Sequence, residues 1–209
     1  MSVASVVLER GIEEVLHFTT NKGVVGILAS GCVKSRGELP TEKYLEYVYS
    51  PNCVKRYDAP WFGYVNLSIS RINSSLFDVA SGRWHRDSDL WWCVLAFDSV
   101  VLSHPGVLFA TTNNMYSGVS RASGEVGLNA LFESEVPQYL ARVARRSSVT
   151  PLNQPTCFQA EALYPKSLSI GFLRTIYVAT PEHEDVVCGQ LFMLDISGVS
   201  CVVCPERFS

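Results

Sequence analysis

The order of apolar and polar positions near the start of the chain predicts a strand followed at once by a helix. Residues 15–19 are mostly β-branched, aromatic or leucine, a composition typical of a strand. Thr20 or Asn21 would then cap a helix that runs to about Ser30, and Gly31 would end it in the left-handed conformation. The first connection of the fold is therefore expected to be short, with the end of the strand close to the start of the helix.

The rest of the pattern predicts many short strands and few helices. Apolar runs rich in β-branched and aromatic residues predict strands at 64–70, 91–97, 107–111, 157–163, 175–179 and 200–203. Helical segments are expected to end within 9–14, to occupy 137–145 and part of 181–194, and to form one turn near 42–47 inside a long loop at 36–62. Strands and helices do not alternate regularly and no repeat occurs, so the pattern favours an α+β fold with a mixed, strongly curved sheet.

Composition is consistent with one cytosolic domain over residues 1–209. A chain of 209 residues with 47% hydrophobic content can bury a substantial core. It lacks an apolar run near the ~18 residues that span a bilayer, and its start lacks the features of a signal peptide. Seven cysteines scattered through apolar segments indicate reduced thiols. Cys201 and Cys204 have the spacing of zinc ligands, but no second Cys or His pair follows, and no metal is predicted.

The net charge of −3 argues against a protein that grips nucleic acid over a large surface. A brief encounter with a short strand remains compatible with it. Basic residues occur locally at 34–36, 55–56, 83–86 and 142–146, either as solvated surface or as phosphate contacts.

The most informative single residue is Glu161, which lies within the apolar run Phe158 to Leu163. Burying a carboxylate costs free energy, which marks it as a candidate for a chemical task. An ionised carboxylate in a poorly solvated groove can bind ribose hydroxyls, stabilise an oxocarbenium ion and take a proton from a nucleophile. The alternative is a glutamate on the wet face of a half-buried strand. No Rossmann or P-loop glycine pattern and no local nucleophile motif competes with this interpretation.

Other polar residues interrupt the predicted strands. His17 and Thr19 are two positions apart, which places both side chains on one face of a strand, where they can bind a flat polar ligand or be satisfied within the core. Comparable positions are Asn66, Ser68, Ser70, Arg71 and the run Thr111 to Asn114. In the long loop, Tyr49, Tyr57 and Trp61 can either stack on bases or pack on the core.

Four motifs follow one another over most of the chain. They are Leu16-His17-Phe18-Thr19 with Gly26 to Gly31, then Tyr64 to Asn73, then Phe109 to Asn114, and Gln159-Ala160-Glu161. With these motifs in this order, the chain resembles the DarT family of bacterial toxins, which ADP-ribosylate bases of single-stranded DNA and are restrained by the macrodomain antitoxin DarG. The run 66–73, together with Trp91-Trp92-Cys93 and His104-Pro105-Gly106, resembles the branch that modifies guanine rather than thymine.

That resemblance implies the ADP-ribosyltransferase fold, with NAD as co-substrate in the cleft of a split, curved sheet. It implies that Glu161 is catalytic, with Arg56 as the best match to the catalytic arginine, Lys55 as a neighbouring competitor and Arg71 as another candidate. The residues expected against NAD are His17, Thr19, Gly26, Tyr64, Ser68 and Arg71. Those expected against DNA are Tyr49, Tyr57, Trp61, Thr111, Thr112, Asn113 and Asn114. The thymine branch has a histidine near the position of Asn114.

The function predicted from the sequence is therefore transfer of ADP-ribose from NAD to guanine in single-stranded DNA, with release of nicotinamide. Unpaired DNA is expected because the exocyclic amine of guanine faces its pairing partner in a duplex. Alternatives with the same NAD cleft are transfer to thymine, RNA or protein, and simple NAD hydrolysis. A catalytically silent module that binds NAD or nucleic acid is a further alternative, although such a module gains little from a buried carboxylate.

Overall fold

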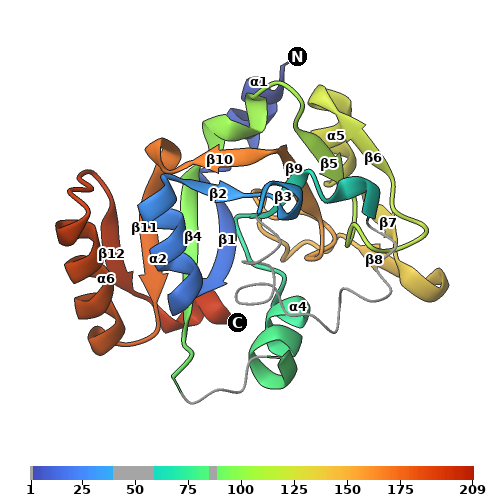
Figure 1. Cartoon of the computed structure of the whole chain (residues 1–209). Helices are drawn as coiled ribbons and strands as arrows, with labels where there is room; N and C mark the ends of the chain where they lie inside the picture. Colours follow the sequence, from blue (N-terminus) through green and yellow to red (C-terminus); the bar gives the residue numbers. More distant parts are fainter. Residues whose placement is uncertain (1, 40–58, 85–88) are drawn as a thin grey trace.

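An eight-stranded mixed sheet forms the centre of the molecule (Figure 1). The computed structural model describes residues 2–39, 59–84 and 89–209. The strand order is β12-β11-β4-β1-β3-β9-β5-β6, and neighbours are antiparallel except β11 and β12. The strands are β1 Glu14–Thr20, β3 Tyr64–Ile69, β4 Trp92–Asp98, β5 Leu108–Ala110, β6 Arg121–Ser123, β9 Glu161–Pro165, β11 Leu173–Val178 and β12 Ser200–Val203.

Helices cover the sheet and its ends. They are α1 Val3–Arg10, α2 Asn21–Ser30, α4 Ser74–Val79, α5 Gly124–Ala130 and α6 Pro181–Met193. Helix α2 packs on β1 and β4, α6 flanks β11 and β12, and α1 packs on α5 at the other end of the sheet (Figure 1). Two small ribbons complete the described part of the fold: β2 Cys32–Lys34 with β10 Ser167–Ser169, and β7 Glu135–Pro137 with β8 Val143–Arg145.

Each face of the sheet has its own apolar cluster, because successive side chains of a strand point to opposite sides. Val15 and Leu95 belong to the larger cluster, which includes residues of α1, α2 and α6. Leu16 and Val94 belong to the smaller one, together with Phe77 of α4.

The sheet splits between β1 and β3. Strand β1 pairs with β4 along its whole length, from Glu14 to Thr20. With β3, by contrast, it pairs at two positions, Val15 with Ile69 and Leu16 with Ser68. Beyond Leu16 the two strands are no longer joined by a ladder, although both continue. This leaves the second half of β1 and the first half of β3 as facing borders within the described sheet.

The structure confirms the α+β class with a mixed sheet and most of the expected strands. It also confirms the helix predicted from Thr20 or Asn21 to Ser30, which is α2. The Thr20 hydroxyl accepts a hydrogen bond from the Gly23 N–H, and Gly31 adopts φ 72° at the end of the helix. Helix α1 ends at Arg10, within the expected range 9–14. Two strand starts differ from the expectation: β1 begins at Glu14 instead of Val15, and the strand expected from Cys157 begins at Glu161.

The helix expected at 137–145 is wrong. This segment forms part of the β7–β8 hairpin, with Val136 opposite Ala144. Its tip, Tyr139–Ala141, contains Leu140 and Ala141 at φ 57° and 56°, a left-handed conformation that a helix cannot continue. Cross-strand pairing with a segment upstream of the predicted helix overrides the local helix preference of the run. The short helices α4 and α5 were not predicted, and the turn expected at 42–47 lies outside the described residues.

Gly127 makes the close approach of α5 to β6 possible. A Cβ at this position would collide with the backbone carbonyl oxygen of Ala122. We expect Gly127→Ala to lower the free energy of unfolding by about 1–3 kcal/mol, because backbone has to shift to accept the methyl group. Urea denaturation measures this change. Gly189→Ala in α6 is the matched control, since its Cβ would meet nothing within 4 Å. Equal stability of the Gly127 variant and the wild type would contradict the packing argument.

Candidate active site

Glu161 is the first residue of β9 and is 5% exposed. Its Oε2 accepts a hydrogen bond from the backbone N–H of Asn114 over 2.8 Å. A bond from a backbone amide favours the charged form of a carboxylate, which offsets part of the cost of burial. The sequence prediction of a buried glutamate at a strand is confirmed, and the wet-face alternative is excluded by the exposed fraction.

A row of residues across five strands, β6, β5, β9, β3 and β1, determines the surroundings of Glu161. Ala110 of β5 lies opposite Glu161 on one side and opposite Arg121 of β6 on the other. On the far side of β9, Leu67 pairs with Ala162, and the next step of that register brings Ser68 opposite Glu161. Ser68 pairs in turn with Leu16 of β1. Glu161, Ser68 and Leu16 therefore share one face of the sheet.

Asn114 is held by Arg121. The Arg121 Nε donates to Asn114 Oδ1 over 2.6 Å, and its Nη2 donates to the Asn114 backbone carbonyl over 2.7 Å. The guanidinium also lies 4.5 Å from the centroid of the Trp61 ring. Burial lowers the pKa of Arg121, and the negative charge of Glu161 acts in the opposite direction. Trp61, Arg121, Asn114 and Glu161 thus form one connected group.

The other residues of the predicted run 111–114 differ in what they offer to a ligand. Thr112 is fully buried, and its Oγ1 accepts a hydrogen bond from the Cys157 thiol. Thr111 is buried as well and accepts from the Ser120 N–H. Asn113 is partly exposed, and its Oδ1 accepts from the Met115 N–H. Of the four, Asn113 has the most access to a ligand, whereas Thr111, Thr112 and Asn114 shape the loop.

His17 lies where β1 and β3 separate. Its Nδ1 is 3.1 Å from the backbone carbonyl oxygen of Asn66 on β3. A carbonyl only accepts, so Nδ1 carries the proton of the bond and Nε2 of the neutral ring is an acceptor. Burial lowers the pKa of His17, while the bond to Asn66 raises it, and the net effect is downward. The ring is therefore neutral at neutral pH and presents an acceptor nitrogen.

The start of α2 lies directly against the end of β1. A Cβ on Gly23 would collide with Oγ1 of Thr19, so the helix approaches Thr19 as closely as a glycine allows. Gly26, one turn further, is different: a Cβ there would meet nothing within 4 Å. The geometry gives Gly23 a clear reason to be glycine and gives Gly26 none within the described residues.

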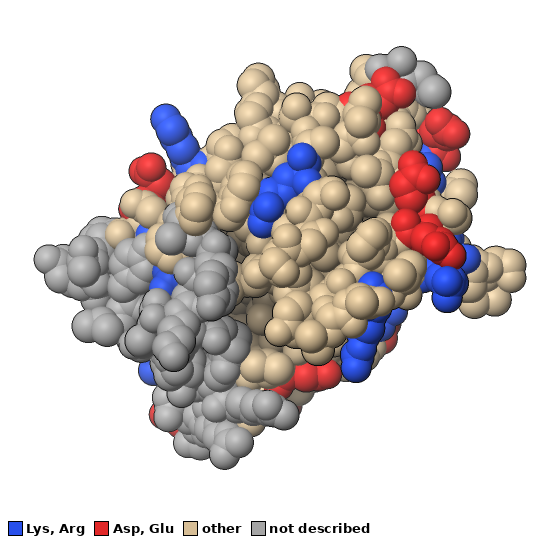
Figure 2. Space-filling view, turned by 90° about the vertical axis from the view of Figure 1, so that its right-hand side faces the viewer, with Lys and Arg blue, Asp and Glu red and all other residues tan. Residues whose placement is uncertain are grey.

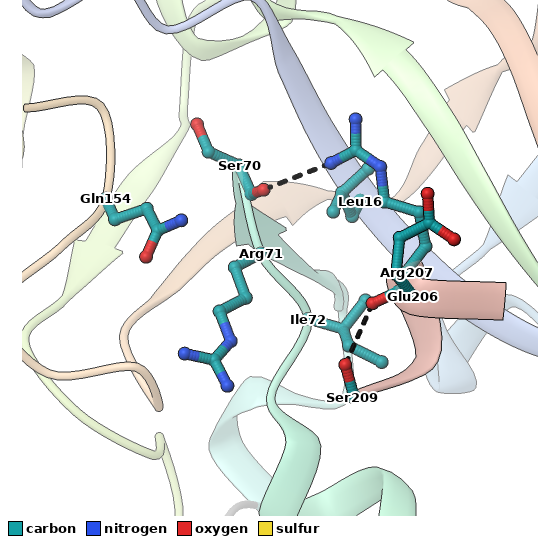
Figure 3. Close-up of a pocket in the computed structure, with 8 residues that line it drawn as sticks. All are labelled: Leu16, Ser70, Arg71, Ile72, Gln154, Glu206, Arg207 and Ser209. Carbon is teal, nitrogen blue, oxygen red and sulfur yellow. Dashed lines mark hydrogen bonds between the residues drawn. The ribbon is translucent and has the colours of Figure 1, made fainter. Parts of the chain in front are cut away.

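A pocket of about 390 Å³ lies beside the end of β3 (Figure 3). Ser70 and Arg71 lie between Gln154 on one side and residues of the C-terminal segment, Glu206, Arg207 and Ser209, on the other. Arg207 pairs with Glu14 over 2.7 Å and donates to the Ser70 carbonyl over 3.5 Å. Leu16 also lines this pocket, so it opens on the same sheet face as Glu161.

The structure brings some predicted site residues together and leaves others apart. Glu161 binds Asn114 directly, and Arg121 links Asn114 to Trp61. Arg71 lines the same pocket as Leu16. Tyr64 begins β3 with its ring 5.7 Å from that of Trp61. Thr19 is a neighbour of α2 rather than of the pocket. The predictions for Tyr49, Lys55, Arg56 and Tyr57 lie outside the described residues.

Sequence reasoning missed Arg121, Gly23 and Arg207. Arg121 stands alone between a Ser-rich loop and a short helix, so no pattern marked it. Gly23, three residues after the Thr20 cap, was a visible signal, because glycine in a first helical turn has a cost that packing can explain. Arg207 reaches the pocket from the end of the chain, which local patterns cannot reveal.

Several other features bear on the type of site. The six described cysteines are free thiols. Within the described ranges, no group of three or more metal-binding side chains is found, and Cys201 and Cys204 have no further ligand. None of the helices in the described part of the chain has the length and apolar character to cross a bilayer.

Three solved structures share the fold. This chain is 16% identical to DarT of Thermus sp. 2.9 in complex with NAD+, with 94% of this chain and 98% of that chain covered and a TM-score of 0.66. The same protein in complex with ADP-ribosylated ssDNA gives 14% identity, 95% and 97% coverage and a TM-score of 0.64. Thermosipho africanus DarTG in complex with ADP-ribose gives 14% identity and a TM-score of 0.65, and the match covers 94% of this chain but 51% of that longer chain.

A family model matches nearly the whole chain. The match covers residues 16–206, and the family is described as DarT, ssDNA thymidine ADP-ribosyltransferase. No curated protein sequence matches. The matched range begins at Leu16, includes Glu161 and ends at Glu206, so it contains every described residue of the candidate site except Arg207 and Ser209. The chain therefore belongs to the DarT family of single-stranded DNA ADP-ribosyltransferases.

Proposed function

We propose that this protein is the toxin of a toxin–antitoxin pair, that Glu161 drives its reaction, and that the acceptor is a base of an unpaired DNA strand. The observation that carries the proposal is the buried Glu161 carboxylate, held by a backbone N–H at the start of a strand beside the split of the sheet. A carboxylate in this setting is suited to stabilising positive charge in a site from which water is excluded.

In the proposed reaction, the bond between nicotinamide and ribose breaks and nicotinamide leaves as a neutral base. The sugar becomes cationic, and Glu161 near the ribose 2′-hydroxyl stabilises that charge. The acceptor nitrogen of the base attacks the anomeric carbon and loses a proton, which Glu161 accepts. Because one Glu161 oxygen is bound to the Asn114 N–H, the carboxylate is oriented before the substrate arrives.

NAD is proposed to bind where β1 and β3 diverge. His17 supplies a neutral acceptor nitrogen at this split, and Thr19 supplies a hydroxyl at the start of α2. Tyr64 and Ser68 line the β3 side, and Arg71 supplies a positive charge for the pyrophosphate. Gly26 of α2 is proposed as a further contact, because a Cβ at this position would meet no other atom within 4 Å and space is open beside it.

DNA is proposed to approach the group around Trp61 and Asn113. Trp61 offers a ring for stacking and Asn113 offers polar groups on a partly exposed loop. Tyr49 and Tyr57 are proposed to contact DNA as well, and Arg56 is proposed as the catalytic arginine. These three residues lie outside the described residues. Lysines and arginines occur at separate points on the face shown in Figure 2, so a few phosphate contacts plus stacking, rather than a broad basic surface, would supply the affinity.

The family description names thymidine, so thymidine is the acceptor that the comparisons favour. Guanine, predicted from the motifs, is the second candidate. The observation that favours it is Asn114, which stands near the position of a histidine in the thymine branch and is engaged with Arg121 here. The antitoxin is proposed to be a DarG-like macrodomain protein; the similar chain from Thermosipho africanus is a DarTG, of which this chain matches about half.

Glu161→Gln is expected to lower the rate of nicotinamide release by at least about 100-fold, because it removes the charge that faces the cation. The glutamine oxygen still accepts from the Asn114 N–H, so the fold and NAD affinity should persist. The exposed Glu135→Gln, which loses a surface pair with Arg145, is the matched control and should keep wild-type activity. Wild-type turnover in the Glu161 variant would remove this residue from the mechanism.

His17→Ala and Thr19→Ala are each expected to weaken NAD binding by about tenfold, the loss that corresponds to one hydrogen bond. Calorimetric titration of NAD measures it. Thr175→Ala on β11 is the control, because its hydroxyl contacts Ser200 at the far edge of the sheet. Unchanged affinity in both variants would show that NAD does not bind at the split.

Single-stranded oligonucleotides that contain thymine or guanine as the one variable base identify the acceptor. With labelled NAD, we expect label on one of the two and much less on the duplex form, whose bases are paired and stacked. If guanine is modified, replacing it with hypoxanthine should abolish labelling, because hypoxanthine lacks the exocyclic amine. Binding of the oligonucleotide should weaken as salt is raised, with a slope set by the small number of phosphate contacts. Equal labelling of duplex and single strand would contradict the accessibility argument.

A further inference from the structure

Arg121 links Asn114 and Trp61 in the candidate site, although no motif marked it. Its two hydrogen bonds both go to Asn114, one to the side-chain oxygen and one to the backbone carbonyl. A planar guanidinium has the fixed, forked geometry for such a pair of bonds, whereas a lysine ammonium is a point charge. The Trp61 ring contacts the Arg121 guanidinium and further restrains its position.

The two ends of the 111–120 loop lie in the same cross-strand row as Glu161. The chain leaves β5 at Ala110, opposite Glu161, and returns in β6 at Arg121, opposite Ala110. Between these points the loop has to turn the Asn114 N–H toward Glu161, and Arg121 binds Asn114 on both sides of its Cα. The C=O and the N–H of Asn114 belong to two different peptide planes that meet at its Cα. Arg121 holds the carbonyl and the side chain, two of the groups attached to this Cα, which restricts rotation about its backbone bonds and with it the direction of the N–H.

A carboxylate that moves by a small distance loses much of its electrostatic effect on a transition state, because preorganised groups must already face the developing charge. The Asn114 N–H binds Oε2 and is one of the contacts that set the direction of Glu161. Arg121 does not donate to Glu161 in any of the described hydrogen bonds; apart from the attraction between their opposite charges, its effect passes through Asn114.

We propose that Arg121 is a positioning residue of the transfer reaction, which orients Glu161 by holding Asn114 against it. This inference rests on the proposed role of Glu161. It assigns to Arg121 an effect on the chemical step and not on the binding of NAD or DNA. It also assigns to Trp61 a second task, as the surface that keeps the Arg121 guanidinium in place, alongside its proposed contact with DNA.

The first test is steady-state kinetics of nicotinamide release by Arg121→Ala and Arg121→Lys. We expect kcat to fall by about 10- to 100-fold in the alanine variant, with KM for NAD within about twofold of the wild type. The lysine variant keeps the charge but not the forked bonds, and should stay at least about fivefold below the wild type. Arg174→Ala, which loses an exposed pair with Asp98 on the opposite part of the sheet, is the control and should keep wild-type kcat.

A rise in KM with unchanged kcat, or full activity of the lysine variant, would overturn the assignment in favour of substrate binding or simple charge.

The second test measures stability and does not need activity. The two variants Arg121→Ala and Glu161→Ala form a double-mutant cycle of unfolding free energies. The loss in the double variant should be smaller than the sum of the two single losses, because both residues bind Asn114 and their opposite charges attract. Additive losses would refute the coupling. Absence of nicotinamide release by the wild-type protein would refute the proposed function but not this coupling.

Discussion

The hydrogen bond from the Asn114 N–H to Glu161 is the interaction around which this end of the sheet is organised. A carboxylate that is 5% exposed needs hydrogen-bond partners, and the backbone of a neighbouring loop supplies one of them. The loop can supply it because it begins and ends in the same row of residues as Glu161. The burial of Glu161, the register of β5, β6 and β9 and the conformation of the 111–120 loop are therefore linked by the hydrogen bond between Glu161 and Asn114.

The second constraint is the divergence of β1 from β3. The two strands are joined at two paired positions, and the backbone groups beyond these positions need other hydrogen-bond partners. One of these groups is the Asn66 carbonyl, which accepts a hydrogen bond from the His17 ring. The same ring is neutral because burial lowers its pKa more than the bond raises it. A histidine that replaces a ladder hydrogen bond thus holds the border of the split and leaves an acceptor nitrogen for a ligand.

The sequence was sufficient to predict features that depend on local chemistry. The Thr20 cap, the Gly31 stop and the burial of Glu161 follow from residue types and their neighbours, and the structure confirms them. The β7–β8 hairpin and the role of Arg121 depend on which strands become neighbours, which no single segment encodes. The helix expected at 137–145 was wrong for this reason: Val136 and Ala144 meet across a turn that the local pattern did not reveal.

The acidic net charge fits a protein that meets its nucleic acid briefly. An enzyme that modifies a base has to release the strand afterwards, and a large basic surface would slow that release, since each phosphate contact adds affinity. The described site instead concentrates its polar contacts on one carboxylate and its supports, with Arg121 engaged internally rather than displayed. In the proposed mechanism, Arg121 orients the Glu161 carboxylate and is not available to bind phosphate. Its proposed contribution is to the chemical step, where fixed geometry matters more than affinity.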